Sequence, residues 1–171
     1  MRQPARALRR FAAIATTACG LALAGAAHAQ LSSTGGPIAA GADNAYVIEP
    51  ERVQIWSGRA EAVQGTTRVR ADEIRIYHSA TSGGGIGDIE RFVATGNVFF
   101  VTPTQVIRGD EAVFTPGDDL IVVSGGVILR QGMDVLSGSR LTIYVRQNRA
   151  VLEGQQTSEG RRVRGVFYPD E

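Results

Sequence analysis

The chain lacks most of the side chains on which enzymes and metalloproteins depend. Its 171 residues include one cysteine, two histidines, one tryptophan and no lysine. Cys19 lies in the segment predicted below to be removed, which excludes a disulfide or a thiol site in the mature chain. His78 is then the one histidine left, too few ligands remain for a metal site, and no G-x-S-x-G nucleophile elbow is present. We therefore expect neither enzymatic activity nor a cofactor.

Charge is missing from residues 11–27, a run of small and apolar residues that follows four arginines. The run ends in the small-x-small pattern AHA. These features predict a secretory signal peptide over residues 1–29, cleaved between Ala29 and Gln30, and export to the periplasm. The alternative is an uncleaved membrane anchor, but the run is at the short end for a membrane span and a cleavage site follows it.

Removal of the signal peptide changes the charge of the chain. The remaining 142 residues carry 14 arginines against 17 acidic residues, a net charge of −3. Nothing in this balance calls for a nucleic acid partner. The remaining length is enough for one domain with a hydrophobic core.

Helix signals are almost absent from the mature chain. Residues 30–45 are small, polar and rich in glycine and proline, which predicts a flexible leader. Over residues 46–171, short runs of valine, isoleucine, phenylalanine and tyrosine alternate with turn residues. This alternation predicts one all-β domain.

An internal repeat organises that domain. Three segments align on their first glycine. Fourteen residues after that glycine, each segment has an aspartate or a serine, and the residue just before it is small. The glycines are Gly58, Gly96 and Gly125, and the later positions are Asp72, Asp110 and Ser139. The last two glycines are 29 residues apart, and a further 29 leads to Gly154, so the repeat predicts three full units and a truncated fourth. The first unit is longer by a nine-residue insertion near residues 79–87.

Each unit is best interpreted as two strands joined by a tight turn, VQGTT, VTPTQ or RQGMD. Glycine inside a strand usually marks a bulge, and a bend at the same height in successive strands curves the sheet. A parallel β-helix lacks such hairpin turns, and a closed barrel tends to have longer, flatter strands. We therefore predict a β-jelly roll of bent, stacked antiparallel hairpins with open edges.

The repeat resembles the OstA-like domain of lipopolysaccharide-transport proteins over residues 47–154. The first unit is the most similar, with Gln64-Gly65 at its turn and Ala71-Asp72 before its second strand. The resemblance implies a periplasmic β-jelly roll whose apolar groove carries lipopolysaccharide from the inner membrane to the outer. The small soluble, LptA-type member of that family has a cleaved signal and no other domain, as expected here. The implied partners are lipopolysaccharide with its lipid A, an inner-membrane anchored OstA-like protein and an outer-membrane translocon.

A groove for acyl chains needs an apolar face, and the repeat supplies one. The candidate groove residues are Ile74, Ile76, Val98, Phe100, Ile107, Phe114, Val127, Leu129, Leu136, Leu141 and Ile143. The same residues would also serve as the packed core of a β-sandwich, which remains the alternative. Arg68, Arg70 and Arg75 are candidate contacts for the lipid A phosphates, since guanidinium groups bind phosphate bidentately, although such an alternation also fits the solvated face of a strand.

Open sheet edges with similar ends predict a head-to-tail homo-oligomer. The C-terminal VRGVFYPDE is either an edge strand that contacts the outer-membrane partner or a frayed tail. The alternative function is a generic exported β-sandwich module that binds protein or polysaccharide. Such a module would show aromatic platforms, whereas Trp56 is the one tryptophan.

Overall fold

The computed structural model describes residues 31–32, 35–83, 86–158 and 160–169. The predicted signal peptide, residues 1–29, lies outside the described residues. The long strands are β3 (Val53–Gln64), β4 (Thr67–His78), β5 (Ile89–Val101), β6 (Gln105–Thr115), β7 (Leu120–Gln131) and β8 (Asp134–Tyr144). The short ones are β1 (Ala39–Gly41), β2 (Asn44–Ile48), β9 (Arg149–Glu153), β10 (Gln155–Thr157), β11 (Gly160–Arg162) and β12 (Arg164–Val166). Two 3₁₀ turns, η1 (Pro116–Asp118) and η2 (Val145–Gln147), complete the described elements, and the predicted all-β class is confirmed.

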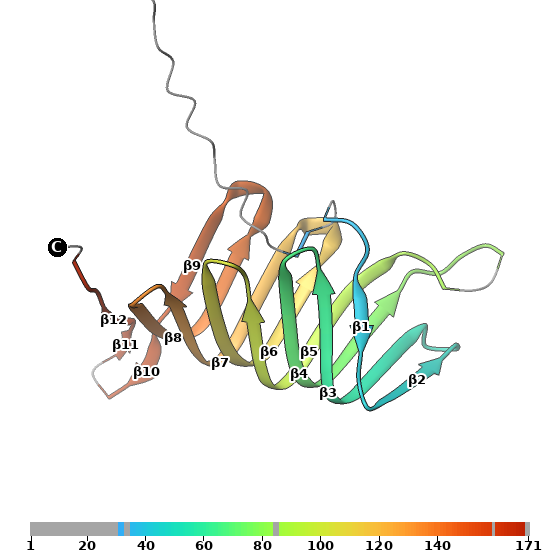
Figure 1. Cartoon of the computed structure of the whole chain (residues 1–171), viewed down its shortest axis with the longest axis horizontal. Coiled ribbons are helices and arrows are strands. Elements are labelled where there is room, and N and C mark those ends of the chain that lie inside the picture. Colours follow the sequence, from blue (N-terminus) through green and yellow to red (C-terminus); the bar gives the residue numbers. More distant parts are fainter. Residues whose placement is uncertain (1–30, 33–34, 84–85, 159, 170–171) are drawn as a thin grey trace, which may run out of the picture.

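Successive hairpins build one open antiparallel sheet of ten strands. The strand order is β1-β3-β4-β5-β6-β7-β8-β12, with β2 also paired to β3 and β9 also paired to β8. The three predicted turns connect β3 to β4, β5 to β6 and β7 to β8. Because the long strands β3 to β8 pair in the order in which they follow one another in the chain, the sheet is a meander with an open edge at either end (Figure 1).

The repeat glycines bend the sheet, as predicted. The pairing register shifts at each of them, between Ser57 and Ala60, between Thr95 and Val98, and between Ser124 and Val127. At Gly96 and Gly125 the φ angles are 77° and 81°, and the residue after each glycine also has positive φ. Two consecutive left-handed residues oppose one residue on the next strand, which is a β-bulge.

The bulges divide the sheet into two wings that face each other like the sides of a trough (Figure 1). We call the halves that flank the three tight turns the first wing: residues 60–64, 67–71, 98–101, 105–109, 127–131 and 134–138. The second wing comprises residues 53–57, 73–78, 89–95, 111–115, 120–124 and 140–144. Buried residues of both wings form a single hydrophobic cluster. The inner faces of the two wings therefore make up the core.

The N-terminal part differs from the predicted flexible leader over residues 30–45. Strand β1 pairs with the first-wing half of β3 and β2 pairs with its second-wing half, so together they form one bent strand. Asp43 lies between them at the bend, and its backbone N–H donates to the Gly58 carbonyl over 2.8 Å. The spacing from Asp43 to Gly58 equals that from Asp110 to Gly125, so this strand is the second half of a further repeat unit.

The C-terminal part is the truncated fourth unit. Strands β9 and β12 pair with the two halves of β8, and the small β10–β11 hairpin separates them. The Ser139 hydroxyl donates to the Gly154 carbonyl over 2.8 Å, at the level of the other bends. Both ends of the sheet are thus single bent strands without an outer neighbour in the described chain.

Candidate functional site

The predicted groove residues line the space between the wings. Nine of the eleven are buried, with exposed fractions of 5% or less, and belong to the common cluster. They are Ile74, Ile76, Val98, Phe100, Ile107, Phe114, Val127, Leu141 and Ile143. The other two, Leu129 and Leu136, are half-buried. These side chains come from five of the six long strands, β4 to β8, and lie together on one inner surface.

Among the inner residues that sequence reasoning missed are Phe92, Ala94, Ile121 and Val123. They stand four and two residues before the repeat glycines, whereas the predicted residues follow a repeat glycine. Because Phe92, Ala94, Val98 and Phe100 are all buried, the same alternation continues through the bulge. Extending the alternation backward from Gly96 would have found them.

The interior is packed in its middle and hollow towards its ends. Phe92, Phe100 and Phe114 are each no more than 2% exposed. Between the wings near β9, by contrast, a hollow of about 160 Å³ is lined by Ile107, Leu129, Leu141 and Ile143, with polar residues such as Gln105 and Arg149 at its walls.

The two wings are joined along the bend and not at their tips. Strand pairing runs within each wing, and none of the backbone hydrogen bonds of the described residues links the tip of one wing to the tip of the other. Side-chain packing closes most of the seam between the tips, and near β3 N-terminal residues also lie across it. Parting the wings therefore leaves the backbone ladder intact.

Near β3 the N-terminal residues lie across this seam. Leu31 is 1% exposed and belongs to the common cluster. The buried Gln64 side chain accepts from the Ser32 N–H over 3.0 Å and donates to the carbonyls of Ser32 over 3.0 Å and Gly36 over 2.7 Å. A hollow of about 510 Å³ separates these residues from Ile89 and Phe114 of the second wing.

The three predicted phosphate-binding arginines do not form one site. Arg68 and Arg70 lie on the outer face of the first wing, where both pair with Glu61 over 3.2 and 3.0 Å. Arg75 lies on the outer face of the second wing, and its hydrogen bond to Glu73 over 2.7 Å raises the pKa of the guanidinium. Each arginine thus already has a carboxylate partner, and none faces the groove.

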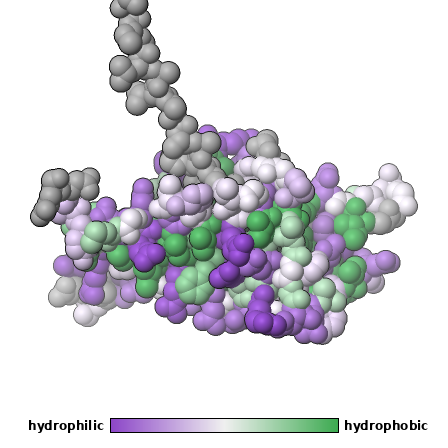
Figure 2. Space-filling view, in the orientation of Figure 1, coloured by the Kyte–Doolittle hydropathy of each residue, from purple (hydrophilic) through white to green (hydrophobic). Residues whose placement is uncertain are grey.

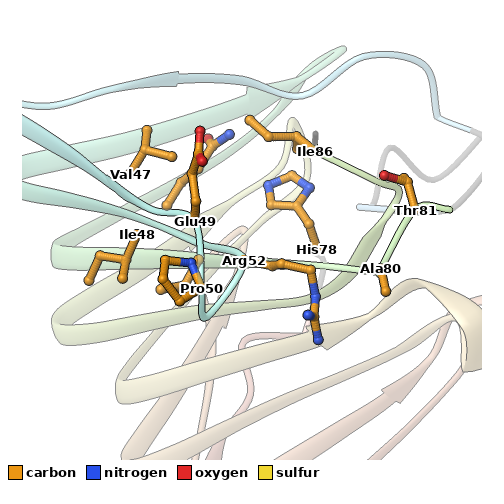
Figure 3. Close-up of a pocket in the computed structure, with 11 residues that line it drawn as sticks. Val47, Ile48, Glu49, Pro50, Arg52, His78, Ala80, Thr81 and Ile86 are labelled. Atoms are coloured by element: carbon orange, nitrogen blue, oxygen red, sulfur yellow. The ribbon is translucent and has the colours of Figure 1, made fainter. Parts of the chain in front are cut away.

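A third hollow, of about 340 Å³, lies at the tip of the second wing (Figure 3). It is lined by the β2–β3 turn and by residues around the predicted insertion, among them Val47, Arg52 and Ile86. His78 is 8% exposed there, and its Nδ1 lies 2.9 Å from the Gly87 carbonyl. Because a carbonyl only accepts, Nδ1 carries the proton, and among the described residues Nε2 has no hydrogen-bond partner.

In the described part of the chain, no group of three or more histidine, cysteine, aspartate and glutamate side chains could hold a metal ion. None of the described elements is a helix long and apolar enough to cross a membrane.

The fold and its inner face define a β-jelly-roll domain whose two wings enclose an apolar interior. The family model described as "LptA/(LptD N-terminal domain) LPS transport protein" matches residues 40–149. The chain belongs to this family of lipopolysaccharide transport proteins, which is a transport family and not an enzyme family.

Two further proteins are similar to this chain. An uncharacterized protein of Rhizobium meliloti (strain 1021) is 29% identical in an alignment of 165 residues that covers 88% of this chain and 89% of that protein. The crystal structure of LptH from Pseudomonas aeruginosa matches with a TM-score of 0.67 at 14% identity, covering 81% of this chain and all of that one. LptH is described as the LptA-homologous periplasmic component of the lipopolysaccharide transport device, and the likeness confirms the β-jelly-roll fold.

Proposed function

We propose that this protein is a periplasmic chaperone that carries lipopolysaccharide through the groove between its wings, from an inner-membrane complex to an outer-membrane one. One observation carries the proposal: a continuous apolar inner face runs across β4 to β8 beneath a seam that no backbone hydrogen bond between the described wing tips closes. Burying an acyl chain against such a face contributes about 25 cal/mol per Å². Lipid entry replaces contacts between the wings with contacts to the lipid, so little apolar surface need meet water.

The second half of the proposal is a bridge made of several copies. Every strand from β2 through β3–β8 to β9 runs antiparallel to the one before it, so β9 runs opposite to β2. When copies stack in the same orientation, β9 of one copy can therefore pair antiparallel with β2 of the next. The repeat fixes the register: the residue before each glycine pairs with the residue after each aspartate, as Thr95 does with Glu111. Glu153 of one copy would then pair with Asn44 of the next, and the two grooves would join.

Localisation and partners follow from the same reasoning. The predicted signal peptide and the periplasmic relative LptH both support export to the periplasm. The open β1–β2 edge and the β9–β12 edge are suited to the anchored OstA-like partner and to the outer-membrane translocon. Energy for transport then comes from a partner, because the groove supplies binding alone.

Neighbouring residues on β7 provide a sharp test of the groove. Leu129 is half-buried on the inner face, whereas Ile128 is 39% exposed on the outer face. A photo-crosslinking amino acid at position 129 should label bound lipopolysaccharide, and the same group at position 128 should not. Equal labelling at both positions, or labelling at neither, would contradict the groove and favour a closed β-sandwich module that binds protein or polysaccharide.

A charge placed at the same positions gives an independent readout. Leu129→Arg should reduce the amount of co-purified lipopolysaccharide strongly, because a guanidinium in an apolar groove must keep its hydration. Ile128→Arg makes the same chemical change on the outer face and should leave the lipid content unchanged. Circular dichroism of both variants establishes that the domain remains folded.

A further inference from the structure

The outer face of the first wing is strongly cationic. Residues directly opposite each other on paired strands share a face, so the pairing register identifies its members. The arginines are Arg68, Arg70, Arg108, Arg130 and Arg164, and their cross-strand neighbours on the same face are otherwise uncharged except for Glu61. Within the first wing this outer face therefore carries five positive charges against one negative, and two exposed carboxylates, Asp72 and Asp110, follow it at the bend.

Apolar side chains alternate with these arginines across the sheet. One row of cross-strand partners is Glu61, Arg70, Phe99, Arg108, Ile128, Ser137 and Arg164. The row beside it is Val63, Arg68, Val101, Val106, Arg130, Val135 and Val166. Phe99, Ile128 and Val166 are 38%, 39% and 56% exposed. Figure 1 has the first wing in front, and Figure 2 shows hydrophobic and hydrophilic residues mixed over it.

The second wing supplies an internal comparison. Its outer face carries four arginines against three glutamates, namely Arg75, Arg91, Arg140, Arg149, Glu73, Glu111 and Glu153. Arg91 and Arg149 stack on the rings of Tyr77 and Tyr144, at 4.4 and 4.3 Å from the ring centroids. The excess of positive charge is thus confined to one of two otherwise similar faces, in a chain whose predicted mature form is negatively charged.

We propose that the outer face of the first wing docks on the surface of a bilayer that contains anionic phospholipid. Guanidinium groups bind phosphates bidentately and are weakly hydrated, which suits them to a headgroup layer. Exposed apolar side chains between cationic ones are the pattern of an interfacial membrane contact. With strands about 4.8 Å apart, the seven-strand rows extend over roughly 30 Å, which fits an extended surface better than a single molecule.

The Glu61 pairs do not neutralise the face. Glu61 is one carboxylate shared by Arg68 and Arg70, so this cluster keeps one net positive charge. Arg108 and Arg130 form no ion pair with any of the described residues, and both are exposed on neighbouring strands. These two arginines should therefore supply most of the attraction. The docking is separate from the proposed groove, which opens on the opposite side of the same wing.

Vesicle flotation tests this proposal with the full mature chain. We expect the protein to float with phosphatidylcholine vesicles that contain phosphatidylglycerol, not with pure phosphatidylcholine, and to dissociate at high salt, because salt screens exposed charges. Arg108→Glu with Arg130→Glu should reduce the bound fraction at least tenfold. Arg91→Glu with Arg140→Glu makes the same change of charge on the second wing and should alter it less than twofold.

The outcomes separate this contact from the groove. Equal flotation of the two double variants, equal flotation with neutral vesicles, or no flotation at low salt would overturn the proposal. If the first-wing variant lost binding to lipopolysaccharide aggregates while still binding phosphatidylglycerol vesicles, the face would recognise lipopolysaccharide and the proposal would again fail. The groove test at positions 128 and 129 does not depend on these arginines, so either proposal can fail without the other.

Discussion

At the scale of single residues, an aspartate and a glycine meet at three bends of the sheet, those at Gly58, Gly96 and Gly125. The Asp72 side chain lies against Gly96 and the Asp110 side chain against Gly125. A Cβ on either glycine would collide with the carboxylate and would also need a backbone angle that L-residues rarely adopt. The glycine of the repeat is therefore required by both the bulge and its neighbour.

This contact predicts that Gly125→Ala lowers the free energy of unfolding by about 2–4 kcal/mol, since left-handed backbone alone costs roughly 1–2 kcal/mol and the clash adds to it. Gly132→Ala is the control: its φ is also positive, at 59°, but no atom lies within 4 Å of the added Cβ. Urea denaturation of both variants measures the difference, and equal losses would show that Asp110 plays no part.

The bend that includes Asp43 also carries a prediction about pH. The hydrogen bond from Arg59 holds the pKa of the exposed Asp43 carboxyl below its ordinary value. A carboxyl whose pKa is lower in the folded state than in the unfolded state stabilises the fold. This stability is fully present above the unfolded-state pKa of about 4 and is lost as the pH falls through the folded-state pKa. NMR titration should show Arg59→Gln raising the pKa of Asp43 towards that ordinary value. An unchanged pKa would mean that Arg59 does not contact Asp43 in solution.

At the scale of elements, the sequence predicted the long hairpins well and the first strand poorly. Residues 67–78 and their counterparts alternate apolar and polar side chains at a fixed distance from the repeat glycine, so both strands and turns were recognisable. Strands β1 (AAG) and β2 (NAYVI) are three and five residues long, which leaves little alternation to detect. The one usable signal was the Asp43–Gly58 spacing.

The same scale explains which part of the site was predictable. Inner residues follow from alternation, because a strand side chain points to one face or the other. The positions of Arg70 and Arg75 did not follow, because the bend between them places one on each wing and Glu61 and Glu73 pair with them locally. Nor does alternation reveal how tightly the interior is packed.

The segment held by Gln64 gives a prediction for this scale. Gln64→Leu removes three hydrogen bonds between the first β-turn and residues 32–36, which should cost about 1–3 kcal/mol and speed amide exchange at Ser32. Gln131 occupies the equivalent position before Gly132 but is exposed, so Gln131→Leu should change neither quantity. Similar effects of the two substitutions would show that residues 31–38 are not fixed to the turn.

At the scale of the whole molecule, the open edges predict association. Asn44→Glu places a negative charge opposite Glu153 of the neighbouring copy in the proposed register, and like charges facing each other destabilise a strand pair. Light scattering should therefore show weaker concentration-dependent growth for Asn44→Glu, and Glu153→Arg in the same chain should restore it. Failure of the second change to restore growth would place the contact in another register.

Each hairpin of the meander touches only the hairpins on either side of it, and this has a consequence for how such a molecule can vary. Repeating residues 96–124 once more would insert two strands between identical neighbours, with a serine again preceding the next glycine. The trough would lengthen by about 10 Å without any contact of a new kind. A duplication in the gene is then enough to lengthen the groove for a longer ligand or to make each copy span a greater distance. The nine-residue insertion shows that a single unit can also diverge alone.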